Sequence, residues 1–236
     1  MIFESPLFGV AIVTATLAAI MALAACSDSS KRAKLKDHCA TNPARRVCLS
    51  YREDPGTQEF FAAAVGRWKA PCFKKGANGF QDDFYEFSKN LKYTHIRTLY
   101  TDADCTQALY IVIDSGSLRA TKVKGVFDYQ LDLAIDTAII TPLSVTGATV
   151  LASSRACGKA DWESSKSHDL AMCTYAYKQG EVDEEEFSIG GMETFTAIKL
   201  NTAAKQILMG DEGANLYIPK LEDRPKVARE TPYVGP

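Results

Sequence analysis

The chain has 236 residues and a formal net charge of -2, with 46% hydrophobic and 24% charged residues. Its basic and acidic residues are interspersed, so no field of a single sign is expected, and neither nucleic acid nor an anionic membrane surface is implied as a partner. This composition is ordinary for a globular protein and predicts one main domain.

The first segment of the chain is apolar. Residues 7–25 are apolar or small except for two threonines, which is long enough for a marginal membrane-spanning helix. The stretch ends in Leu23-Ala24-Ala25-Cys26, and a polar run follows directly. A transmembrane anchor is the alternative interpretation, but the small residues before the cysteine favour a signal peptide over residues 1–25. Only Glu4 precedes the apolar core where basic residues are usual, so the true start codon stays open.

The tetrapeptide that ends at Cys26 resembles the lipobox of bacterial lipoproteins. The resemblance implies that Cys26 is acylated, with chains such as palmitate, and becomes the first residue of the mature protein. Ser27 resembles the residue at this position in outer-membrane lipoproteins, so we expect anchoring on the periplasmic face of the outer membrane, with exposure at the cell surface as an open alternative. Each buried methylene contributes about 0.8 kcal/mol, so three acyl chains anchor a protein without a spanning helix.

Six cysteines remain besides Cys26, an even number that suits disulfide formation in an oxidising compartment. Their spacing favours pairs that each close a short or moderate loop. We therefore expect the disulfides Cys39–Cys48, Cys72–Cys105 and Cys157–Cys173. A metal site is the alternative, but no Cys-x-x-Cys motif or nearby histidine supports it, so neither a metal nor another cofactor is expected.

Residues 26–56 are polar, basic and rich in turn residues, and we expect a tether with a small disulfide loop. A short N-terminal helix is predicted next. Thr57 suits its cap, Glu59 suits the positive end of its dipole, and Gly66 suits its termination.

Strands are expected from there on. The clearest alternation of apolar and polar residues runs from Phe127 to Asp136 and predicts one long, half-buried strand. Noisier runs predict further strands at 67–73, 83–89, 92–100, 109–114, 117–123, 148–154, 171–178, 195–200 and 206–209. Turn residues at 114–117 and at 179–180 suit hairpins. No crossover helix is visible, so the strands are expected to be antiparallel and to close into a barrel or a sandwich.

A short helix that leads into Gly66-Arg67-Trp68, with Cys72, Cys105 and Cys157 further on, resembles a group of uncharacterised bacterial envelope lipoproteins with a lipocalin-like domain. The resemblance implies an all-β fold, an antiparallel lipocalin-like barrel of eight to ten strands over residues 57–210, with Trp68 plugging its closed end. The basic residue that stacks on this Trp in lipocalins is not identifiable, so ligand-binding positions are not carried over. Residues 211–236 contain four prolines and are expected to form a tail that residues such as Tyr217 and Tyr233 could pin to the barrel.

Candidate catalytic and metal-binding residues are weak. A serine, a histidine and an aspartate occur together at residues 164–169, but adjacent residues of a strand point to opposite faces and cannot align as a triad. His38 and His95 have no partner at metal-ligand spacing. The acidic run 183–186 lacks the calcium-loop pattern and suits a solvated hairpin loop, while Asp102 suits a turn. We therefore expect no catalytic residue and no enzyme, with a hydrolase as the residual alternative.

The expected function is that of a membrane-anchored, non-catalytic lipoprotein that binds a small hydrophobic ligand or lipid. An eight-stranded barrel is just wide enough for one such ligand, and the candidate lining residues are Trp68, Phe127, Tyr129 and Leu131. The alternative is a structural or interaction lipoprotein whose barrel is packed and whose loops engage another envelope protein. Residue types do not decide between a cavity and a packed core.

Overall fold

A computed structural model describes residues 55–75, 79–171, 173–179, 183–189, 191–212 and 217–235, with the backbone alone for 174–179 and 183–188. The predicted tether, Cys26 and the predicted disulfide Cys39–Cys48 lie outside these residues.

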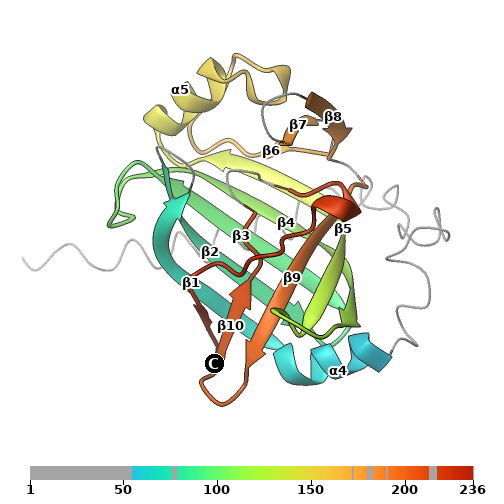
Figure 1. The fold of residues 1–236 in the computed structure, drawn as a ribbon. Helices are drawn as coiled ribbons and strands as arrows, with labels where there is room; N and C mark the ends of the chain where they lie inside the picture. The colour runs from blue at the N-terminus through green and yellow to red at the C-terminus, as the bar shows by residue number, and fades with distance from the viewer. Residues whose placement is uncertain are drawn as a thin grey trace, which may run out of the picture.

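Eight strands form a closed antiparallel barrel (Figure 1). Each strand pairs with the next and the last pairs with the first, in the order β1 (Gly66–Lys75), β2 (Gly79–Ser88), β3 (Lys92–Tyr100), β4 (Ala108–Lys122), β5 (Tyr129–Pro142), β9 (Glu193–Asn201), β10 (Gln206–Met209) and β11 (Tyr233–Val234). The prediction of an antiparallel barrel is therefore confirmed. A short strand, β6 (His168–Asp169), pairs with β5 beyond the part of β5 that pairs with β9. β7 (Thr174–Gln179) and β8 (Asp183–Ser188) form a separate hairpin.

The two helices of the described residues lie at opposite ends of the barrel (Figure 1). α4 (Pro55–Ala64) precedes β1, and its buried side chains Phe60, Phe61 and Ala64 belong to the barrel core. The hydroxyl of Thr57 accepts a hydrogen bond from the amide of Ala120 at 3.0 Å and donates to the carbonyl of the same residue at 3.2 Å, which fixes α4 to β4. No helix among these residues has the length and apolar character needed to span a membrane.

β4 is one continuous strand, so the hairpin predicted at 114–117 is wrong. Its pairing with β5 shifts by one residue between Ser115 and Gly116, which is a β-bulge. A Cβ atom at Gly116 would lie 1.7 Å from the carbonyl oxygen of Ala134 on β5, so a close approach of two backbones requires this glycine. The bulge also shifts the alternation of β5. Before the bulge, odd-numbered residues such as Leu133 face inward, and after it even-numbered residues such as Ala138 do.

The predicted strand at 148–154 is also wrong, because this segment lies in helix α5 (Val145–Ser153). Its valines and threonines favour strands, but Ser144 caps the helix by accepting a hydrogen bond from the amide of Gly147 at 3.0 Å. Gly147 lets the helix approach the barrel, since a Cβ atom there would lie 1.8 Å from the carbonyl oxygen of Leu109.

The acidic run 183–186, predicted as a solvated loop, lies in β8 and pairs with β7. The pairing places Glu184 opposite Lys178 in the backbone register.

The C-terminal segment completes the barrel, which does not close within residues 57–210. β11 pairs with β1 through Lys69 and Val234, and with β10 through two residue pairs. Gly235 lies against the indole of Trp68, because a Cβ atom there would lie 2.4 Å from the ring. The prolines that argued against a strand are compatible with β11 because the strand has only two residues and contains none of them.

Candidate functional site

Alternate residues of each strand point into the barrel, and they form three layers. The layer next to α4 is apolar and includes Phe87, Leu118, Leu131 and Ile198. The layer next to α5 is also apolar and includes Val112, Ile135, Ala138 and Ile140. Between them, buried polar and charged side chains from several strands meet in the middle of the barrel.

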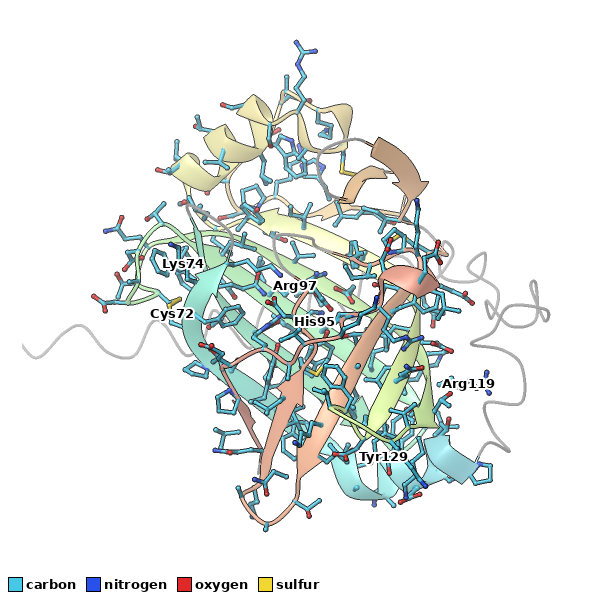
Figure 2. The ribbon with its side chains drawn as sticks, viewed as in Figure 1. Cys72, Lys74, His95, Arg97, Arg119 and Tyr129 are labelled. Atoms are coloured by element: carbon cyan, nitrogen blue, oxygen red, sulfur yellow. A yellow bond between two sulfur atoms is a disulfide. The ribbon has the colours of Figure 1, made fainter. Side chains whose placement is uncertain are left out.

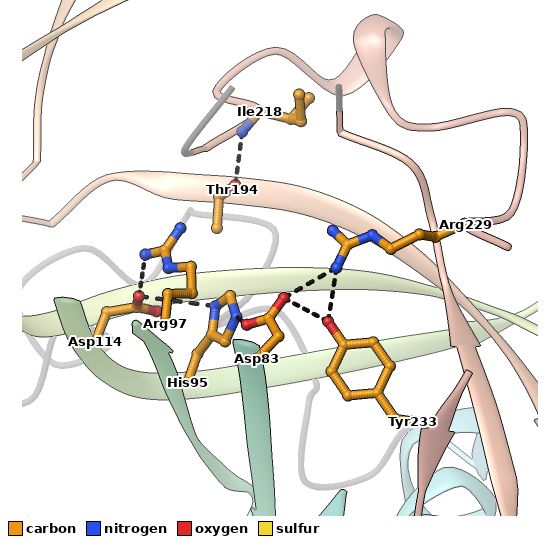
Figure 3. A network of polar contacts seen from close by, with 8 residues as sticks. All are labelled: Asp83, His95, Arg97, Asp114, Thr194, Ile218, Arg229 and Tyr233. Atoms are coloured by element: carbon orange, nitrogen blue, oxygen red, sulfur yellow. Dashed lines mark hydrogen bonds and ion pairs between the residues drawn. The ribbon is translucent and has the colours of Figure 1, made fainter. Parts of the chain in front are cut away.

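The middle layer is a network of hydrogen bonds and ion pairs (Figure 3). Asp83 of β2 is its centre: one carboxylate oxygen contacts His95 Nε2 at 2.5 Å, and the other accepts hydrogen bonds from Arg229 at 3.0 Å and from the hydroxyl of Tyr233 at 2.5 Å. A second carboxylate, Asp114 of β4, pairs with Arg97 of β3 and lies 3.8 Å from His95 Nδ1. His95 therefore lies between two carboxylates.

The backbone register explains why these side chains meet. Asp83, His95 and Asp114 come from three neighbouring strands and occupy inward positions. His95 pairs directly with Tyr85 on one side and with Asp114 on the other. Arg229 and Tyr233 arrive from the C-terminal segment, which lies along β10 and places both side chains against β2. Figure 2 shows His95 and Arg97 among the side chains enclosed by the barrel.

The electrostatics of the network favour its charged form. Burial alone would raise the pKa of Asp83, but the charge and hydrogen bond of His95, together with Arg229 and Tyr233, hold this pKa well below its ordinary value. Burial works against the charged form of Arg97, but Asp114, with smaller contributions from Tyr217, Tyr85 and Asp83, raises its pKa overall. Burial and the charge of Asp83 raise the pKa of Tyr233, so this phenol stays protonated and donates. Both carboxylates are therefore compensated by buried cations.

Aromatic rings pack against the network on two sides. From the α4 end, ring centroids of Phe60 and Phe87 lie 5.1 Å apart, those of Phe87 and Tyr85 lie 5.6 Å apart, and Tyr85 stacks on His95 at 3.8 Å. Beyond Asp83, the guanidinium of Arg229 lies 4.6 Å above the ring of Phe73. These contacts form a column of side chains, from Phe60 to Phe73, that runs along the inner face of β2.

The predicted lining residues divide between the barrel core and a groove outside it. Trp68, Tyr129 and Leu131 belong to the core cluster at the α4 end, and Trp68 donates a hydrogen bond to the carbonyl of Ala64 at 2.7 Å. Phe127, in contrast, lies before β5 begins and borders an open groove on the outside of the barrel. This groove, of about 460 Å³, lies between residues 123–130 and the C-terminal residues 221–226.

Two of the predicted disulfides are confirmed. Cys72 at the bulge of β1 is bonded to Cys105 in the loop between β3 and β4. Cys157, which follows α5, is bonded to Cys173, which precedes β7. The first disulfide therefore ties two parts of the barrel rim, and the second ties the segment that covers the α5 end.

The serine, histidine and aspartate at 164–169 contact other partners. Ser167 shares a hydrogen bond with Thr141 at 2.8 Å, and Asp169 accepts one from the amide of Ala171 at 2.8 Å. The ring of His168 lies at the edge of Trp162. This arrangement does not form a nucleophile, base and orienting group.

Asp102 is a turn former, as predicted. Its carboxylate accepts hydrogen bonds from the amides of Thr106 and Gln107, and the hydroxyl of Thr106 and these amides lower the pKa of Asp102. Among the residues that the structure describes, no three histidine, cysteine or acidic side chains are grouped so that they could hold a metal ion.

The charged layer was missed in the sequence, where His95 stood without a partner. The signal was the phase of alternation: Asp83 shares its phase with Tyr85 and Phe87, and Asp114 shares its phase with Val112 and Leu118. A carboxylate in phase with buried apolar residues predicts an inward charge, and hence a buried cation near it.

No protein-family model matches this chain, and no curated protein matches it significantly in sequence.

Proposed function

We propose that this protein is a membrane-anchored lipoprotein, held through acyl chains on Cys26, whose filled barrel serves as a rigid scaffold for contacts with another component of the cell envelope. The observation that carries the proposal is the column of side chains from Phe60 through Tyr85, His95 and Asp83 to Phe73, which packs inside the barrel along β2 and includes a buried carboxylate with its cations. Displacing a buried carboxylate and its cations to admit an apolar molecule carries a large penalty.

The anchor is tested in cells. Radiolabelled palmitate should mark the wild-type protein and should not mark a Cys26→Ser variant, which is expected to fractionate with soluble proteins. A Cys26→Ser variant that stays in the membrane fraction and matures normally would contradict the anchor.

The filled interior is tested with an apolar fluorescent probe and the purified protein. We expect no saturable uptake by the wild type. Leu118→Ala combined with Leu131→Ala provides the matched control, because it removes two fully buried side chains at the α4 end and opens a cavity. Uptake by the double variant alone supports a packed barrel.

Saturable binding by the wild type would instead favour the second candidate function, the carriage of a small hydrophobic ligand. The inward positions of Trp68, Tyr129 and Leu131 are compatible with that function. A scaffold also predicts one dominant partner after crosslinking in cells, and crosslinked products without such a partner would count against it.

A further inference from the structure

The charges inside the barrel do not balance if His95 carries two protons. Two guanidinium groups, Arg97 and Arg229, are paired with the carboxylates of Asp114 and Asp83. Each of these two pairs is neutral, so the protonation of His95 decides the net charge of the network. At the rim, Lys75 and Glu212 add one charge of each sign and leave the balance unchanged.

Both ring nitrogens of His95 face a carboxylate. The ring is held by stacking on Tyr85, with an angle of 13° between the planes. In this position Nε2 faces Asp83 at 2.5 Å and Nδ1 faces Asp114 at 3.8 Å. A neutral imidazole has one N–H and would turn a lone pair toward one of these carboxylates, whereas the imidazolium presents an N–H to both. Three cations then face two carboxylates, and the buried network carries one positive charge in excess.

Two buried hydroxyl groups in the barrel have no hydrogen-bond partner among the described residues: Tyr93 Oη on β3 and Thr196 Oγ1 on β9. Both side chains are 1% exposed and occupy inward positions of their strands. Burial, with the charges of Asp114 and Tyr217, raises the pKa of Tyr93, while Arg97 lowers it, so this phenol is protonated and lies within the field of the network. An unpartnered buried hydroxyl is costly and indicates a further group beside it.

We propose that the middle of the barrel binds one small monovalent anion, a halide or a carboxylate, beside Arg97 with the hydroxyl of Tyr93 as a donor. The anion balances the excess charge of the network and gives Tyr93 an acceptor that none of the described residues provides. Thr196 on the opposite part of the wall is a second available donor. The inference does not depend on the lipid anchor, and it adds a binding site to a barrel that is otherwise filled.

Sodium bromide is the probe, at constant ionic strength with sodium gluconate as the balancing salt, because gluconate is too bulky for a site that takes a small anion. We expect the melting temperature of the wild type to rise with bromide and to saturate, and bromide NMR relaxation to broaden upon binding. Tyr93→Phe removes one hydrogen bond to an anion and should weaken bromide binding about tenfold. Tyr100→Phe is the matched control, since that hydroxyl bonds to Asp82 on the outer side, and its bromide affinity should equal that of the wild type.

Equal melting temperatures in both salts, or the same bromide response in the two tyrosine variants, would overturn the proposal and leave ordered water as the partner of Tyr93. His95→Gln provides a second measurement: glutamine still donates to Asp83 but removes the excess charge, so bromide binding should be lost while the protein folds.

Carboxylates of different length separate this proposal from the proposed function. Formate should compete with bromide, whereas octanoate should not, because a filled barrel, as proposed above, has no room for an alkyl chain. Competition by both carboxylates would support the anion site and contradict the filled barrel. Competition by neither would restrict the site to halides.

Discussion

The barrel has a strong wall and a weak seam. In the wall, β2 to β5 are 9 to 15 residues long and pair along most of their length. In the seam, β10 has four residues and β11 has two, and β11 meets β1 through one residue pair. The wall is held by a backbone ladder, so the seam must be held mainly by side chains.

Those side chains are arginines and aromatic residues of the C-terminal segment. Arg229 and Tyr233 reach Asp83 of the wall, and Gly235 lies on Trp68. Arg224 pairs with Asp132 and donates to the carbonyls of Leu131 and Thr196 at 2.8 and 2.7 Å. The comparison teaches that buried charge can close a sheet where the backbone pairing is too short to do so.

The largest effect is expected from the residue that joins the two regions. Asp83→Ala leaves the charges of Arg229 and His95 buried without their carboxylate, which should cost about 3 to 5 kcal/mol in the free energy of unfolding. Asp82→Ala is the control, because Asp82 faces outward and pairs with the exposed Lys69, so a change below about 1 kcal/mol is expected. Denaturant unfolding measures both, and equal losses would show that the network does not join wall and seam.

The two disulfides should also differ in how much each stabilises the fold, with the larger contribution from the one next to the seam. Cys72–Cys105 closes a loop of 33 residues and connects β1, next to the seam, with the wall, whereas Cys157–Cys173 closes 16 residues in the segment at the α5 end. Loop entropy predicts losses of about 4 and about 3 kcal/mol when each pair is replaced by alanine. Thermal unfolding of the two double variants tests the order, and the reverse order would place the weaker region at the α5 end.

A smaller change should act on the seam alone. Tyr233→Phe removes one hydrogen bond to a charged group and should cost about 2 kcal/mol. Hydrogen exchange should accelerate at the amides of β10 and β11 and stay slow in β3. Exchange that accelerates equally in β3 and β10 would mean that wall and seam open together.

The smallest expected effect is a change of slope in acid, and it concerns the charge of Asp83. Because its pKa is lower in the folded chain than in the unfolded chain, its contribution is fully present above its unfolded pKa, near 4, and is lost as the pH falls toward the folded pKa. Asp83→Asn should therefore show a shallower loss of stability below about pH 4 than the wild type. Parallel curves for the two proteins would mean that other carboxylates dominate acid unfolding.

The sequence predicted the barrel because apolar and polar residues alternate cleanly from Phe127 to Asp136, most of which lies in β5, and recur with a noisier alternation along most of the other strands. It did not predict that β4 is continuous. A glycine such as Gly116 is expected both in a hairpin turn and in a β-bulge where two backbones approach closely, and the sequence alone does not distinguish them. α5 was missed because a single cap at Ser144 outweighs the strand preference of its valines.

The charged layer and β11 were missed for another reason. Both depend on contacts between residues far apart in the chain, such as the hydrogen bond from Tyr233 to Asp83 across 150 positions. Local alternation reports whether a residue faces inward, but it does not report which cation faces which carboxylate. For that reason the sequence predicted the strand pattern and two disulfides that the structure contains, but it did not predict the buried charged network.

The position of β11 at the far end of the fold sets the order of events during synthesis. A polypeptide that emerges from its N-terminal side exposes an unpaired edge of β1 until Val234 arrives, because those two strands are neighbours in the finished barrel. Pairings of such long range form slowly. The barrel of the nascent chain therefore stays open until the last strand is made, an interval in which a chaperone can bind the unpaired edge.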